Sequence, residues 1–598
     1  MTLHNSEAAA TSGLAKRRAG RTVLCLLAAL AVVTTGEVTD ATDLGRSSVR
    51  VRWDWATNIP RLAANGGAAQ PARQRVPMVR DFSTRHVIFP ESVPASRVNA
   101  LRASSRAWQQ YLHRHAHRYV PFERDYVHDP HAKESIVRDW SYSLNGGSGG
   151  TISAPAKYVF DVNATPSCTN DFVVTGVNIA GSATQANMIG LNSLYNTPAG
   201  TGLCAGTAPT LLFAYNVGPG VVSSYVALSL DGTKVAFNEN NGANSFLHIL
   251  KWATGAGNGT SAAAAVKPGT GNTAVDTKLA LTGGASTAPF IDYDADVAYV
   301  TTADNRVRKF SGVFLGTPTE VTGAGTGWPS NPGVTGLSTP IFDSVSRHVF
   351  FVDSSTGGID YIDDSVVPAV ANTNKFLFAP GLTVAAPIIV DSGNQKVYAF
   401  SSNTNGAAAV VAQADTNLSL ASQVSVSVGG ATNLLPPLTG DFNEEYYNGV
   451  SGSSLLYVVG NDGSANRVPA LYSIGFNASY KMNPAVTNGP LALARNVASI
   501  NASPVTAFFN STLGKQYLFV SVTGSCSTII AGGCIRTLDV TNNVFPTAAT
   551  INNVVFATTG GTGGISVDNI SLSAGAASVY YTTLTGRTIV KATQALLQ

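Results

Sequence analysis

The feature that most constrains this chain is a repeat of short apolar strands joined by polar turns. Ser338–Val352 reads STPIFDSVSRHVFFV, in which one short strand, a tight turn at Asp343 and a second strand follow each other. Related stretches carry marker prolines 51, 47, 49 and 68 residues apart, at Pro289, Pro340, Pro387, Pro436 and Pro504. A period near fifty residues with several strands in each period is typical of a β-propeller.

The repeats set the expected number of blades. Inner strands are expected to begin near Lys157, Ser223, Thr287, Thr339, Ala386, Leu435, Ser503 and Ile565. The sequence therefore predicts an all-β fold over residues 135–598, a single β-propeller of about eight four-stranded blades. Seven blades is the alternative, because the copies near Leu435 and Ile565 diverge from the others.

The two ends of the repeat region complement each other. The last repeat shows only three strands, whereas SIVRDWSYSL (Ser135–Leu144) is an isolated strand before the first repeat. We expect this early strand to complete the last blade, because closure removes the exposed edges of an open array.

A signal peptide is predicted at residues 1–36. Basic residues at 16–18 and Arg21 precede the apolar run Val23–Val33, which is shorter than the roughly 20 residues of a membrane span. No clear cleavage motif follows the run, so an uncleaved anchor is the alternative. We expect a secreted or periplasmic protein with no membrane span after signal removal.

Residues 37–134 form an Arg/His-rich N-terminal segment. Residues 46–138 hold fifteen arginines, whereas residues 139–598 hold seven. A helix is expected over Ser96–Tyr119, where His113 and His117 lie four residues apart, but no matching carboxylate or cysteine suggests a metal site. A basic arm that docks on the propeller or on an anionic surface is the preferred interpretation. The net charge of +3 does not indicate a nucleic-acid partner.

Four cysteines remain after the signal segment: Cys168, Cys204, Cys526 and Cys534. An even number in an exported protein favours disulfides, and proximity in sequence favours Cys168–Cys204 and Cys526–Cys534. The alternative is four free buried thiols.

Two families of periplasmic propellers resemble these repeats. SLDGTKVAF (Ser229–Phe237) resembles the repeat core of the Tol-system periplasmic propeller, and the proline-containing copies resemble quinoprotein-dehydrogenase-like propellers. These resemblances imply four-stranded blades and an extracytoplasmic location. Quinoproteins usually carry a tryptophan motif on many blades, whereas this region has only Trp252 and Trp328 after Trp140. We therefore expect no cofactor.

The expected function is binding, to a carbohydrate, a peptide or a cell-surface partner, by a monomer. The sequence contains no G-x-S-x-G, H-E-x-x-H or P-loop motif. The alternative is an enzyme, such as a glycoside hydrolase or polysaccharide lyase with carboxylates near the axis, because propeller enzymes draw residues from several blades.

The candidate ligand-binding residues lie in the loops between the second and third strands of the blades. These loops are expected on the same face as the links between blades, and they carry Glu239, Asp304, Asp353 and Asp462, with Asn240, Asn305, Asn403 and Asn461 beside them. Such a ring could bind sugar hydroxyls or a cation, or supply a general acid and base. The competing interpretation is turn formation, which Asp and Asn favour.

Overall fold

The computed structural model describes residues 136–594, apart from 151–152, 161–165, 197–201, 243, 379–386, 403–408, 431–437, 451, 511–513, 553 and 569–577, together with four short strands before residue 136. The predicted signal peptide, the helix over Ser96–Tyr119 with His113 and His117, and Asn403 lie outside the described residues. The propeller belongs to the compact unit Ser48–Gln598.

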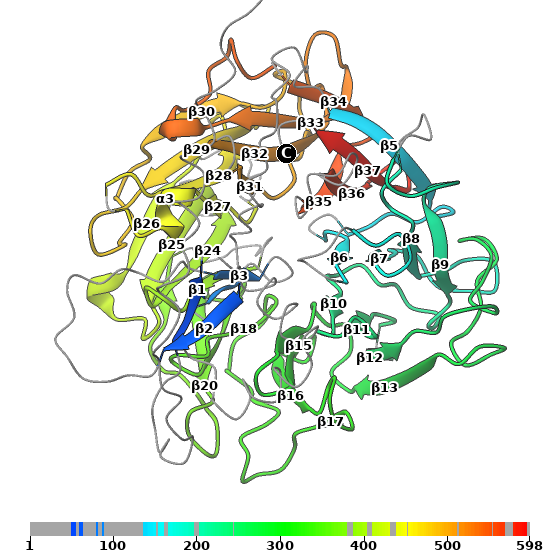
Figure 1. Cartoon of the computed structure of the whole chain (residues 1–598). Helices are drawn as coiled ribbons and strands as arrows, with labels where there is room; N and C mark the ends of the chain where they lie inside the picture. Colours follow the sequence, from blue (N-terminus) through cyan, green and yellow to red (C-terminus); the bar gives the residue numbers. More distant parts are fainter. Residues whose placement is uncertain are drawn as a thin grey trace, which may run out of the picture. The chain divides into compact units, whose positions relative to one another are not determined.

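Eight antiparallel sheets follow one another in sequence order around a ring, so the eight-bladed prediction is confirmed (Figure 1). Blade one contains β6 (Ala156–Tyr158), β7 (Phe172–Gly176), β8 (Met188–Asn192) and β9 (Thr210–Tyr215). Blade two contains β10 (Ala227–Leu228), β11 (Lys234–Glu239), β12 (Ser245–Lys251) and β13 (Val275–Leu281). Blade three contains β14 (Phe290–Asp292), β15 (Val297–Thr302), β16 (Arg306–Ser311) and β17 (Thr319–Glu320).

Blade four contains β18 (Ile341–Phe342), β19 (His348–Asp353) and β20 (Gly358–Asp363), with β21 (Val370–Ala371) and β22 (Phe376–Leu377) both pairing with β20. Blade five contains β23 (Ile389–Asp391), β24 (Lys396–Ser402), β25 (Ala409–Asp415) and β26 (Val424–Ser427). Blade six contains β27 (Asp441–Phe442), β28 (Leu455–Asn461), β29 (Pro469–Gly475) and β30 (Asn488–Ala492).

Blade seven contains β31 (Thr506–Asn510), β32 (Lys515–Gly524), β33 (Gly532–Asp539) and β34 (Val554–Thr558). Blade eight contains β35 (Thr562–Asp568), β36 (Ser578–Thr583), β37 (Thr588–Gln594) and β5 (Ile136–Ser143). The short helices are α3 (Glu444–Tyr447), η2 (Leu420–Ser422) and η3 (Thr541–Asn543). Before the propeller, β1 (Arg50–Asp54) pairs with β2 (Ile59–Ala63), and β3 (Val79–Asp81) pairs with β4 (His86–Ile88), which meets β23.

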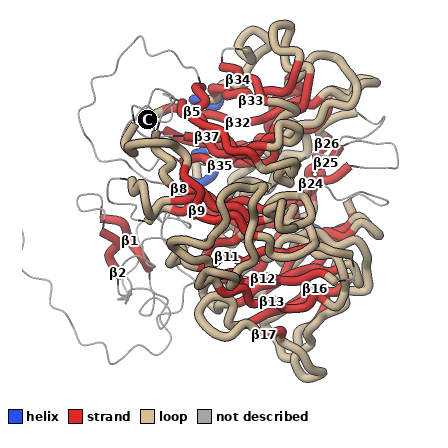
Figure 2. The backbone as a smooth tube through the Cα atoms, turned by 90° about the vertical axis from the view of Figure 1, so that its right-hand side faces the viewer, coloured by secondary structure: helices blue, strands red, loops and turns tan. Residues whose placement is uncertain are grey.

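The core lies between successive blades. All six residues of β19 are buried, and Tyr299 of blade three stacks on Phe342 of blade four with 5.3 Å between ring centroids. Because both faces of each sheet pack on neighbours, the middle strands are continuous apolar runs instead of alternating ones. The edge-on view in Figure 2 shows β11, β12 and β13 side by side in blade two.

The ring is closed by the N-terminal strand, as predicted. β5 pairs with β37 along its length, with Tyr142 opposite Ile589, and the two strands lie side by side in Figure 1. At this seam the buried Lys591 of β37 donates to the carboxylate of Asp139 in β5, which also accepts from Thr593. Closure therefore joins a strand from each end of the propeller through a ladder and an ion pair.

Aspartates form the turn after the inner strand in several blades. Asp231 accepts from the backbone N–H of Thr233, Asp343 from that of Ser346 and Asp391 from that of Gly393, at 2.9–3.0 Å. This recurrence confirms that these residues form turns.

Both expected cysteine pairs are disulfides in the structure, Cys168–Cys204 and Cys526–Cys534. Two disulfides indicate an oxidising, extracytoplasmic compartment. Among the described residues, no helix has the length and hydropathy needed to cross a membrane.

The start of the inner strand of blade six expected near Leu435 lies outside the described residues. In the described part of this segment, β27 pairs with β28 through Asp441 and Phe442.

Candidate functional site

The loops between second and third strands lie beside the links between blades, on the face expected for them. The side chain of Asn240 accepts from the backbone N–H of Ser286 at 2.7 Å, and Asn305 accepts from that of Gly336 at 3.0 Å. Asn461 accepts from the N–H of Gly430 at 3.0 Å. Asn240 and Asn305 therefore tie a loop to the link that leads into the next blade, whereas Asn461 ties its loop to the link that leads into its own blade.

Three of the four candidate carboxylates bond within their own blade. Asp353 is buried and accepts from the backbone N–H of Thr356 at 2.6 Å, and Asp462 accepts from that of Ser464 at 3.0 Å. Asp304 is exposed and forms an ion pair with Arg308 at 2.9 Å. Burial alone would raise the pKa of Asp353, but the hydrogen bonds from Thr356 hold it below its usual value.

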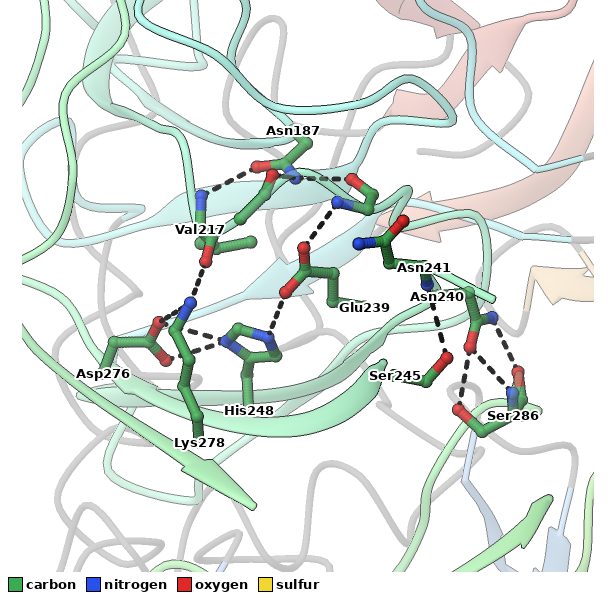
Figure 3. A network of polar contacts seen from close by, with 12 residues as sticks. Asn187, Val217, Glu239, Asn240, Asn241, Ser245, His248, Asp276, Lys278 and Ser286 are labelled. Atoms are coloured by element: carbon green, nitrogen blue, oxygen red, sulfur yellow. Dashed lines mark hydrogen bonds and ion pairs between the residues drawn. The ribbon is translucent and has the colours of Figure 1, made fainter. Parts of the chain in front are cut away.

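The fourth candidate, Glu239, belongs to a chain of charged side chains between blades one and two, which is buried except at Lys278 (Figure 3). Its Oε2 lies 3.0 Å from Nε2 of His248 in β12, and Nδ1 of His248 lies 3.0 Å from Oδ1 of Asp276 in β13. Asp276 lies 3.7 Å from Nζ of Lys278. The sheet register allows this, because Glu239 stands opposite Phe246 and His248 opposite Lys278, on the face of the blade that meets blade one.

Both ends of this chain hold the link that leads from blade one into blade two. Oε1 of Glu239 accepts from the backbone N–H of Gly220 at 2.6 Å, and Nζ of Lys278 donates to the carbonyl of Val217. From the other side, the amide of Asn187 bonds Val217, Gly218 and Gly220. Figure 3 shows the link enclosed by these contacts. We call the four side chains Glu239, His248, Asp276 and Lys278 the link clamp.

The clamp is an ion-pair network with a protonated histidine at its centre. A ring nitrogen that faces a carboxylate must donate, and both nitrogens of His248 face one. Burial alone would lower the pKa of His248, but the hydrogen bonds to Asp276 and Glu239 raise it above 6.5. Burial alone would raise the pKa of Glu239, but His248 and the Gly220 N–H lower it below 4.5. Because both of its ring nitrogens contact a carboxylate, His248 holds the side chains of Glu239 and Asp276 in place.

A pocket of about 530 Å³ adjoins the clamp between blades one and two. Its lining includes Asp276 and Lys278 of the clamp, Lys267 of the loop between β12 and β13, and Asn216. The volume lies within the range of small-molecule sites. We connect this pocket with the function of the protein.

Sequence reasoning found Glu239 but missed His248, Asp276 and Lys278. His248 and His348 are the two histidines of the propeller region, and both lie in apolar strands, which could have marked them. Asp276 follows a loop from 252 to 274 that has no periodic pattern. The pairing that brings Asp276 next to His248 therefore could not be predicted from the sequence.

A second pair of acidic side chains lies in blade four. Burial and a hydrogen bond to Asp353 raise the pKa of Asp360 to about 7, against the opposing effect of Lys375, whose Nζ lies 3.1 Å from Oδ1. Two carboxyl groups with separated pKa values can serve as acid and base, but the exposed fraction of Asp360 is 2% and that of Asp353 is zero. Among the described residues, no group of three or more His, Cys, Asp or Glu side chains is arranged to hold a metal ion.

No family model and no curated protein matches this sequence. Solved structures that resemble it include Sqt1 from Chaetomium thermophilum, at 12% identity and a TM-score of 0.45, covering 77% of this chain and 100% of that one. BamB from Moraxella catarrhalis has 11% identity and a TM-score of 0.39, with 77% and 99% covered. A putative 6-phosphogluconolactonase from Bacteroides uniformis has 9% identity and a TM-score of 0.34, with 63% and 96% covered. Such low identity says nothing about ligand or activity.

Proposed function

We propose that this chain is a secreted or periplasmic binding propeller whose ligand enters the pocket between blades one and two. The supporting observation is that the pocket wall is fixed in advance by the link clamp, which holds Val217 and Gly220 from both ends. A wall that is already ordered loses little conformational freedom when a ligand arrives, and this favours affinity. The partner is an unidentified extracellular ligand or surface molecule, the signal peptide at 1–36 supplies export, and the protein acts as a monomer.

The test is a screen of the exported protein against glycan and peptide arrays, with variants that separate the two candidate faces. Pro268→Trp places an indole at the pocket lining and should abolish binding of a hit. Thr270→Trp, on the same loop but outside the lining, is the matched control and should bind normally.

The same screen tests the carboxylate ring on the loop face. If the triple variant D304N/D353N/D462N loses a hit that Pro268→Trp retains, the ligand binds at the loop face and the pocket proposal fails. The opposite pattern supports the pocket and leaves the three aspartates to turn formation.

The alternative is an enzyme acting on polysaccharide, for which Asp353 and Asp360, with their separated pKa values, would have to become accessible, because both are buried in this structure. Reducing-end assays on neutral and acidic polysaccharides test it. Turnover that is lost in Asp360→Asn would establish the enzyme over the binding module.

A further inference from the structure

This inference rests on the proposed binding function and names the chemistry of the ligand. We propose that the pocket between blades one and two binds a uronic acid unit, a pyranose that carries one carboxylate and several hydroxyl groups.

The charges around the pocket favour a ligand that carries a single negative charge. The link clamp is neutral as a unit, because protonated His248 and Lys278 balance Glu239 and Asp276. Lys267 is exposed at the lining, and its side chain forms no hydrogen bond or ion pair with the described residues. The pocket therefore has one uncompensated cation, which a carboxylate would balance.

Lys278 offers the ligand a hydrogen-bond donor in addition to the charge of Lys267. An ammonium group has three N–H donors. One donates to the carbonyl of Val217 and a second faces Asp276, while 40% of the side chain stays exposed. The third N–H is available to an oxygen of the ligand.

The side chain of Asn216 favours a ligand with hydroxyl groups. Only 8% of this residue is exposed, it lines the pocket, and its amide oxygen Oδ1 has no hydrogen-bond partner among the described residues. Buried amides normally have partners, and an amide can donate and accept at once. A sugar offers both functions on neighbouring carbons, because each hydroxyl can accept one hydrogen bond and donate another.

The remaining walls are small and rigid. A Cβ on Gly218 would lie 2.2 Å from Oε1 of Glu239, and one on Gly181 would lie 2.4 Å from the carbonyl oxygen of Gly218, so close approach requires glycine at both positions. Together with Pro219 and Pro268 these residues leave the space open for a ring without side chains that would have to move.

The experiment is an NMR and calorimetric titration of the full exported chain with three probes: tri-galacturonate, galactotriose and acetate. Tri-galacturonate should bind, galactotriose should bind at least about tenfold more weakly, and acetate should not bind measurably.

Lys267→Met should weaken the binding of tri-galacturonate about tenfold, which corresponds to ~1.4 kcal/mol. Asn216→Leu should weaken tri-galacturonate and galactotriose by the same factor. Lys251→Met, in β12 but outside the lining, should change nothing. Added salt should weaken tri-galacturonate binding in the wild type.

The outcomes separate this inference from the proposed function. Equal affinity for tri-galacturonate and galactotriose, both lost in Pro268→Trp, overturns the charge argument and leaves the pocket as a binding site. Absence of binding by all three probes overturns the uronic acid proposal, while the array screen still decides the binding function. Because Lys267 is exposed and bonded to nothing described, Lys267→Met should fold normally, and unchanged affinity in that variant contradicts the proposal.

Discussion

His248 of blade two and Asp360 of blade four occupy the same place in their sheets. Each stands opposite a phenylalanine of the second strand, Phe237 and Phe351, two residues before the carboxylate that ends that strand. In blade two the resulting neighbours are an acid and a base, Glu239 and His248. In blade four they are two acids, Asp353 and Asp360. The same position should therefore respond to pH in different ways in the two blades.

In blade two, replacing His248 should destabilise the protein most in mildly acidic solution. The raised pKa of His248 means that its stabilisation is complete below pH 6.5 and is lost as the pH rises through the pKa in the folded state. The lowered pKa of Glu239 means that its stabilisation is present above pH 4.5 and is lost as the pH falls through its folded pKa. The difference in free energy of unfolding between the wild type and His248→Gln should peak between pH 4.5 and 6.5.

Denaturant unfolding at pH 5.5 and at pH 9 measures this difference. His348→Gln is the matched control, since His348 is also buried in a strand but bonds the carbonyl of Thr416 instead of a carboxylate. A loss for His248→Gln that is equal at both pH values would contradict the ion-pair description of the clamp.

In blade four, Asp360→Asn should remove a fall in stability toward neutral pH. Between pH 3.8 and about 7 the folded state keeps a proton on Asp360 that the unfolded chain releases, so stability declines across that window. Asparagine stays neutral, and Asp360→Asn should gain on the order of a few kcal/mol relative to the wild type between pH 4 and pH 8.

Melting temperatures across this range provide the measurement. Lys375→Met should extend the decline to higher pH, because removing the cation that faces Asp360 raises the pKa of Asp360 further. If the two variants and the wild type show parallel curves, the Asp353–Asp360 pair does not titrate in this range.

Ring closure should depend on β5. Deleting residues up to Asn145 should destabilise the fold, since β37 would lose its partner strand, whereas deleting residues up to Ala95 should leave it folded. A cooperative melt of the longer deletion at the wild-type temperature would refute this prediction.

The ion pair at the seam can be tested by a double-mutant cycle. Lys591→Met leaves the buried Asp139 without its cation, which should cost about 3–5 kcal/mol. The double variant D139L/K591M should cost less than the two single variants together, because it removes both charges. Unfolding free energies of the four proteins give the coupling, and strict additivity would exclude the pair as a unit.

The two disulfides should contribute unequally. Cys168 and Cys204 are 36 residues apart, whereas Cys526 and Cys534 are 8 apart. On the loop-entropy model the longer closure should stabilise by about 1.3 kcal/mol more. C168A/C204A should therefore melt below C526A/C534A, and the reverse order would show that local packing outweighs loop length.

Much of the architecture could be predicted because short stretches of sequence determine the strands and turns. Apolar runs such as the one ending at Val352 mark strands buried on both faces, and aspartates such as Asp343 mark turns by short-range hydrogen bonds. The isolated strand around Trp140 could be assigned to the last blade only because that blade was one strand short.

The candidate site was less accessible to such reasoning. The contact between His248 and Asp276 spans 28 residues and depends on the register that an irregular loop gives to β13. Asn and Asp in the loops suit both turns and ligands, so composition alone could not separate Asn240, which ties a link, from Glu239, which anchors the clamp.

The closure of blade eight also orders events during synthesis. Asp139 and Lys591 are 452 residues apart, so β5 emerges long before the strand it will pair with. At about 5–20 residues per second, that interval is about 20 to 90 seconds. A stalled chain thus carries an unpaired strand at its start and an open blade edge at its end, and both are substrates for proteases and chaperones. Blade eight can therefore be completed only after β37 has been synthesised.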